Sequence, residues 1–190
     1  MSKPLRACLA LCLAALSAVS MPLLAAEKKS QAEWIYPVIP GFGGVHPRQD
    51  LPVRPDPAKD YRIFVQVVSA GKDPAKVNGA LVRLARLVNL MGYAKVPPEH
   101  VHIVAVLDRE AMLTSMTDQA YRQHLQQDHN PNLPLLHALK AAGVQLMICG
   151  QALAEHGIPD AAISPDVTIT LSALTDIAVY GERGYSFMQL

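Results

Sequence analysis

Five short apolar segments, separated by stretches with helical periodicity, constrain the fold of this chain more than any other feature. Each segment is five to nine residues long and contains β-branched or aromatic residues, and the first four are followed by a turn residue or a helix start, which is typical of buried strands. These predicted strands are residues 61–69, 101–107, 144–149, 167–171 and 185–190.

Helical segments fill most of the intervals between these strands. In residues 73–92 apolar side chains recur every three or four positions, with Asp73 as the expected cap, Pro74 near the first helical position and Gly92 at the end. Further helices are predicted at residues 117–127, 133–142, 150–158 and 172–184.

Strands that alternate with helices along a chain form parallel sheets, because each right-handed crossover helix covers one face of the sheet. We therefore expect an α/β fold, a flavodoxin-like three-layer sandwich with a mostly parallel five-stranded sheet, formed by residues 61–190.

The first 26 residues have the pattern of a signal peptide. Lys3 and Arg6 precede a short apolar stretch at residues 9–19, and the small pair Ala25 and Ala26 follows. The apolar stretch is shorter than the ~20 residues that a membrane span needs. We expect cleavage near Ala26 and a periplasmic or secreted protein that no longer contacts the membrane, with an uncleaved anchor as the alternative.

Residues 27–60 form a leader of different composition. Residues 34–60 contain six prolines and three glycines, which no regular element tolerates. Trp34, Tyr36 and Phe42 make its first half apolar for a free tail. Disorder is one interpretation. The other, which we favour, is an arm packed on its own domain or on a neighbouring subunit.

Charge and motif content exclude several functions. The net charge is +1, from 17 basic and 16 acidic residues, so a nucleic-acid partner is not expected. His100 and His102 would share one strand face, but no third ligand, HExxH or CxxC accompanies them, and we predict no metal. The nucleotide-binding patterns GxGxxG and GxxxxGK[ST] are absent, as is a GxSxG elbow. No cofactor is expected.

Cys149 is the best candidate for chemistry. It is the only cysteine outside the signal peptide, since Cys8 and Cys12 precede Ala26, and it ends a predicted core strand where a helix starts. Sites in parallel sheets form at such carboxyl ends. The backbone amides that follow, at Gly150, Gln151 and Ala152, would stabilise a thiolate. The missing side chain of Gly150 would let a small substrate approach, and the side-chain amide of Gln151 could donate to a bound anion. The alternative is that Cys149 is an unreactive core residue, which is common for a free cysteine.

Asp108 and Arg109 are second candidates for this site. They follow the strand at residues 101–107 and should lie along the same edge of the sheet as Cys149, with Arg109 favouring and Asp108 opposing a thiolate. A solvated turn is the ordinary alternative for both. No general base is assigned, and the remaining candidate histidines around the next turn fit a surface loop: His124, His129 and His137.

Three segments of the chain resemble the DsrE/DsrF-like family, and in particular its exported bacterial branch. They are VNGALVRLARLVNL, NPNLPLLHALKAAGVQLMICGQAL with the following HGI, and VTITLSALTDIAVYGERGYSFMQL. The resemblance covers about residues 61–190, and its most specific part is CGQAL at residues 149–153.

The resemblance implies a parallel five-stranded α/β fold and homo-oligomers that are commonly trimers or hexamers. In the sulfur-relay members, a cysteine at this strand end carries a persulfide between donor and acceptor proteins, and only Cys149 matches that role. The exported branch often has a histidine-glycine pair after the second strand, where this chain has Asp108 and Arg109. The expected function is a periplasmic sulfur carrier or sulfurtransferase. The alternative is a non-catalytic oligomeric module that binds a small ligand or a partner.

Overall fold

A five-stranded sheet forms the centre of the protein. The computed structural model describes residues 33–48 and 51–190, so the predicted signal peptide at residues 1–26 lies outside the described residues. The strands are β1 (Tyr61–Val67), β2 (Val101–Leu107), β3 (Gln145–Cys149), β4 (Thr168–Thr170) and β5 (Ser186–Gln189). All five predicted strands are confirmed, each with bounds equal to or shorter than expected.

Every pairing in this sheet is parallel, and the strand order is β4-β3-β2-β1-β5. The three central strands β1, β2 and β3 are apolar and buried over most of their length, because helices cover both of their faces. The last strand, β5, flanks β1 on the side away from β2, whereas in flavodoxin the second strand takes this place.

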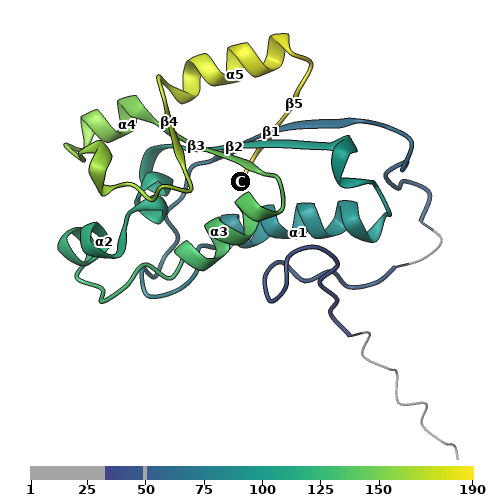
Figure 1. The fold of residues 1–190 in the computed structure, drawn as a ribbon, viewed down its shortest axis with the longest axis horizontal. Coiled ribbons are helices and arrows are strands. Elements are labelled where there is room, and N and C mark those ends of the chain that lie inside the picture. The colour runs from purple at the N-terminus through teal and green to yellow at the C-terminus, as the bar shows by residue number, and fades with distance from the viewer. Residues whose placement is uncertain (1–32, 49–50) are drawn as a thin grey trace, which may run out of the picture. The chain divides into compact units, whose positions relative to one another are not determined.

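The helices form two layers, one on each face of the sheet (Figure 1). Helices α1 (Gly79–Tyr93) and α3 (Leu133–Ala141) contact each other on one face, and α5 (Ala173–Glu182) lies on the other. The three-layer α/β sandwich is therefore confirmed. The shorter helices are α2 (Asp118–Leu125), α4 (Gly150–Glu155) and the 3-10 turns at Pro98–His100, Arg109–Ser115 and Asp160–Ala162.

Helix α1 begins later than its sequence pattern suggested. Asp73 caps no helix, since its carboxylate accepts a hydrogen bond from the Ala75 backbone within a turn. Asn78 is the actual N-cap, and its Oδ1 accepts from the amides of Ala80 and Leu81 at 2.8 and 3.2 Å. Both residue types cap helices well. The predicted start of this helix, near Pro74, was therefore wrong by about one and a half helical turns.

Residues 33–48 of the leader pack on α1. A backbone pairing between Ile35 and Val45 closes a loop, and the side chains of Ile39 and Val45 are buried. Asn89 of α1 is fully buried beneath this loop. Its Oδ1 accepts from the backbone amides of Val38 and Ile39, and its Nδ2 donates to backbone carbonyls within residues 39–43. Residues 33–48 are therefore not a free tail but an arm packed on their own domain.

Candidate functional site

Cys149 is the last residue of β3, and its side chain points to the α5 face of the sheet. Alternate residues of a strand share a face, and the hydroxyl of Tyr180 on α5 contacts Met147, two residues earlier. The Sγ atom of Cys149 accepts a hydrogen bond from the backbone N–H of Ala173, the first residue of α5, at 3.4 Å. Only 4% of the residue is exposed.

The helix start that donates a hydrogen bond to the sulfur is therefore α5, not α4. We expected the amides of Gly150 and Gln151 to face the sulfur, but Cys149 makes no side-chain bond to the start of α4. The reason is the direction of the side chain, which leaves the sheet toward α5. An N–H at a helix start favours negative charge on a neighbouring sulfur. In this structure that N–H belongs to Ala173 of α5 and not to the residues that begin α4.

A cavity of about 200 Å³ lies beside the sulfur and brings most of the predicted site residues together. Asp108, Arg109, Cys149 and Gln151 all line it. Ala152, whose amide was expected to face the sulfur, lines it as well. Sequence analysis did not indicate the remaining lining residues, which come from α4 and from the start of α5: Glu155, Ser172, Ala173 and Leu174.

The connections of the chain explain why a cavity forms at this place. The segment that leaves β3 returns to β4 beside α3, where Lys140 and His137 contact Asp166. The segment that leaves β4 instead enters α5 on the opposite face (Figure 1). Adjacent parallel strands whose connections diverge in this way leave a crevice at their carboxyl ends, which is the common place for ligands in such sheets.

Gly150 does not line the cavity, although we predicted it to admit a substrate. A Cβ atom at this position would lie 2.6 Å from the carbonyl oxygen of Thr170. The missing side chain thus lets β4 approach β3. Gln151 does line the cavity, and its Nε2 donates to the carbonyl of Leu171 at 3.2 Å, which ties α4 to the end of β4.

Asp108 is held in place by a glutamine that sequence analysis did not single out. Gln66 of β1 donates from Nε2 to Asp108 Oδ2 at 2.8 Å, and its own Oε1 accepts from Gln189 of β5 at 3.1 Å. Arg109 follows with φ of +49°, an uncommon left-handed conformation for a residue other than glycine. It also lines a second hollow of about 350 Å³ next to the end of β1.

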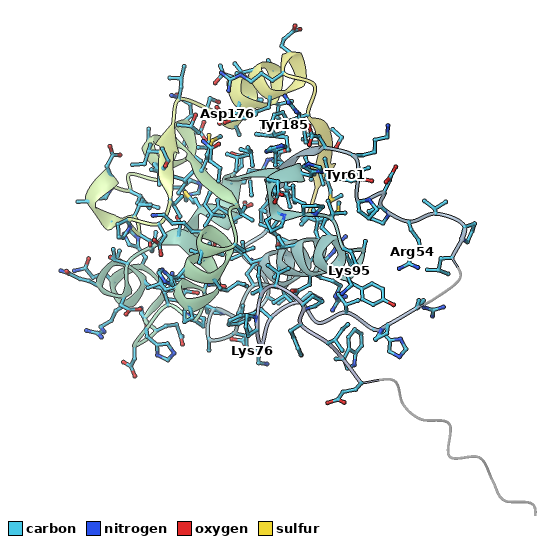
Figure 2. All side chains as sticks on the ribbon, turned by 45° about the vertical axis from the view of Figure 1, so that its right-hand side comes forward. Arg54, Tyr61, Lys76, Lys95, Asp176 and Tyr185 are labelled. Atoms are coloured by element: carbon cyan, nitrogen blue, oxygen red, sulfur yellow. The ribbon has the colours of Figure 1, made fainter. Side chains whose placement is uncertain are left out.

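Asp176 is a buried carboxyl group near this site. It lies in the first turns of α5, only 8% exposed, and Thr170 donates to its Oδ1 at 2.7 Å. Its Oδ2 is buried without a hydrogen-bond partner. Burial raises the pKa of Asp176, and the bond from Thr170 opposes that rise. Figure 2 shows Asp176 and Tyr185 on the α5 side of the sheet.

The histidines lie apart from Cys149. None of them lines its cavity, His100 contacts the carbonyl of Pro57, and His137 pairs with Asp166 on the α3 side. Within residues 33–48 and 51–190, no three His, Cys, Asp or Glu side chains are placed to hold a metal ion. Over the same residues, no helix has both the length and the apolar character that a membrane span requires.

Comparison with known proteins assigns the chain to a family. The model of the DsrE/DsrF-like family matches residues 63–190, which is well over half of the chain. The chain belongs to the DsrE/DsrF-like family. The match runs from β1 to the last strand and so contains Cys149, Asp108 and the whole cavity between them.

Among solved structures, a protein of unknown function from Methanobacterium thermoautotrophicum is similar to this DsrE/DsrF-like protein. The TM-score is 0.47 at 16% identity, over 69% of this chain and 100% of that one. A similarity of this size does not bear on activity. No curated protein matches the chain.

Proposed function

We propose that this protein is a sulfur carrier that holds a persulfide on Cys149. The observation that carries the proposal is the position of Cys149 at the crevice between β3 and β4, with its sulfur bonded to the first amide of α5 and beside a cavity. Membership of the DsrE/DsrF-like family supports it.

The chemistry requires only the cysteine and a sulfane-sulfur donor. The Cys149 thiolate attacks the outer sulfur of a persulfide or polysulfide, the bond between the two donor sulfurs breaks, and its electron pair leaves with the donor as a thiolate. The Ala173 amide stabilises negative charge on Sγ before the attack. No cofactor takes part in this step.

Intact mass spectrometry of the native protein tests this function. The wild-type chain, treated with polysulfide and freed of excess reagent, is expected to gain the mass of one or more sulfur atoms, and a reductant should remove it. The Cys149→Ser variant is the matched control and should gain nothing. Equal gain in both chains, or none in the wild type, would contradict a persulfide on Cys149.

One observation favours a second candidate, a non-catalytic module that binds a small ligand or partner. Cys149 is only 4% exposed, as expected of a cysteine that fills the core. In that case Cys149→Ser should leave folding and partner binding unchanged, and the wild-type thiol should react slowly with iodoacetamide under native conditions. The mass experiment separates the two candidates.

We propose that the protein assembles into a homo-oligomer, a trimer or hexamer. Large apolar side chains are exposed along the segment from β4 to β5, among them Leu171, Leu174, Val179, Phe187 and Met188. Light scattering coupled to size exclusion should give a multiple of the subunit mass. The variants Leu174→Ser and Phe187→Ser should shift it toward the monomer if this surface is the interface.

We propose a periplasmic or secreted location, reached by a signal peptide cleaved near Ala26. The positive and apolar pattern of residues 3–26 supports this. N-terminal sequencing of the protein recovered from a bacterial periplasmic extract should start close to Glu27. A chain that keeps Met1 and sediments with membranes would instead indicate an uncleaved anchor.

A further inference from the structure

A buried glutamine lies near the carboxyl end of β1, where an apolar residue would be expected. Gln66 lies in β1 among buried apolar residues and is only 7% exposed. Burial of an amide costs free energy unless its polar atoms are hydrogen-bonded. Both ends of the Gln66 amide are bonded, Nε2 to Asp108 and Oε1 to Gln189. The side chain thus links β5, β1 and the end of β2.

This link fixes Asp108 next to Cys149. Leu107 pairs with Ile148, so Asp108 and Cys149 follow at the same level on neighbouring strands, and both line the cavity. The Asp108 backbone is held as well, because its N–H donates to the carbonyl of Val67 at 2.9 Å. Gln66 engages only Oδ2 of the carboxylate, and the described part of the chain donates no hydrogen bond to Oδ1.

We propose that Asp108 accepts the proton of the incoming thiol during sulfur transfer from Cys149, and that Gln66 is the positioning residue that holds Asp108 for this step. The inference rests on the proposed function and adds to it the group that moves the proton. A carboxylate with one oxygen fixed by a buried donor and the other unengaged suits this role.

The atoms and electrons of the step balance. The acceptor thiol gives its proton to Asp108 while its sulfur attacks the outer sulfur of the Cys149 persulfide. A new sulfur–sulfur bond forms on the acceptor, the bond between Sγ and the outer sulfur breaks, and its electron pair stays on Sγ. Asp108 then returns the proton to Sγ. One sulfur atom has moved, the protein has regained its thiol, and no external oxidant or reductant is consumed.

Two acceptors separate proton transfer from sulfur transfer. The full-length chain is loaded with polysulfide, freed of excess reagent and mixed at pH 7 with either 2-mercaptoethanol, which must lose a proton, or sulfite, whose dianion has none to lose. Rapid quenching and intact mass spectrometry give the rate at which Cys149 loses its outer sulfur. Loading is measured first for every variant.

Asp108→Asn should slow transfer to 2-mercaptoethanol by about 100-fold, the usual contribution of a positioned general base. Gln66→Leu should slow it by about 10-fold, because Asp108 stays but is no longer oriented. Transfer to sulfite should change by less than about threefold in both variants, because that step needs no general base.

The matched controls are Glu110→Gln and Gln145→Leu. Glu110 is a neighbouring acid that does not line the Cys149 cavity, and Gln145 is a glutamine at the other end of β3. Both should transfer at wild-type rates. If Gln66→Leu fails to fold, Gln189→Leu removes the outer bond of the link at an exposed residue and should show a smaller loss with the same acceptor preference.

Two kinds of failure are distinguishable. Absence of loading in the wild type contradicts the sulfur-carrier function and with it this inference. If loading is normal, two results would contradict the roles of Asp108 and Gln66 and leave the sulfur-carrier function intact. One is transfer from the variants to 2-mercaptoethanol at the wild-type rate, and the other is an equal slowing of transfer to both acceptors.

Discussion

Asp176 couples the stability of the fold to pH. Burial raises its pKa, so the folded chain holds the proton more tightly than the unfolded chain does. The resulting stabilisation is present below the unfolded pKa of about 3.9 and is lost as the pH rises through the higher folded value. At neutral pH the ionised carboxylate therefore destabilises the fold.

The Asp176→Asn variant should reveal this coupling in urea unfolding. Asparagine cannot ionise, so the variant should become more stable relative to the wild type between pH 3.5 and pH 7, which means that its unfolding free energy minus that of the wild type should rise. Glu182→Gln removes an exposed acid from the same helix and should show no such trend. A difference between Asp176→Asn and wild type that is independent of pH would show that the burial has no electrostatic cost.

Asn89 carries the attachment of the leader loop to α1. Its replacement by alanine leaves buried backbone groups of residues 38–43 without partners, at an expected cost of about 3 kcal/mol in unfolding free energy. Urea unfolding measures this, and Arg83→Ala on the exposed side of α1 serves as control. A loss below that of the control would mean that the loop is not held by Asn89.

Part of the candidate site could be predicted from the sequence, residue by residue, for one physical reason. Parallel strands end at a common edge, so residues that follow two predicted strands must meet, and Asp108, Arg109 and Cys149 do so. Gln66 and Asp176 were not singled out. Their roles depend on which residues lie opposite each other on neighbouring strands and on which face of the sheet α5 covers. A single polar residue among apolar ones indicates neither of these.

Among the elements, strands were easier to predict than helix starts. Continuous apolar runs identify buried strands, whereas the cap of α1 was predicted at Asp73 and lies at Asn78, a residue of equally good capping type that the prediction passed over. The 3-10 turn at Arg109–Ser115 has no hydrophobic period and was missed. It fills the corner between the end of β2 and α2.

Glycines at the first position of two helices should respond oppositely to alanine. Gly79 begins α1 with open space where a Cβ would lie, so Gly79→Ala should stabilise the protein by about 0.5–1 kcal/mol. Gly150 begins α4 against the Thr170 carbonyl, so Gly150→Ala should cost about 1–3 kcal/mol by forcing β4 away from β3. Thermal unfolding of both variants checks this, and equal effects would contradict the close approach of β4.

For the whole molecule, the leader loop acts as part of the core. Deletion of residues 33–48 exposes the surface of α1 that Ile39 and Val45 cover, and should lower the unfolding free energy by about 3–5 kcal/mol. A chain beginning at Glu33 is the control and should keep wild-type stability. Urea unfolding decides between them, and a stable deletion variant would show that the loop contributes little.

The position of β5 has a consequence for synthesis and folding. Strand β1 obtains its second neighbour from residues 186–189, and the Gln66–Gln189 bond spans 123 positions. Until residues 186–189 have been synthesised, β1 has an unpaired edge, and Gln66 lacks the hydrogen bond from Gln189. Native pairing must therefore wait for nearly the entire chain. A polypeptide cut short before β5 would carry both an unpaired strand edge, which invites aggregation, and a site without its full support.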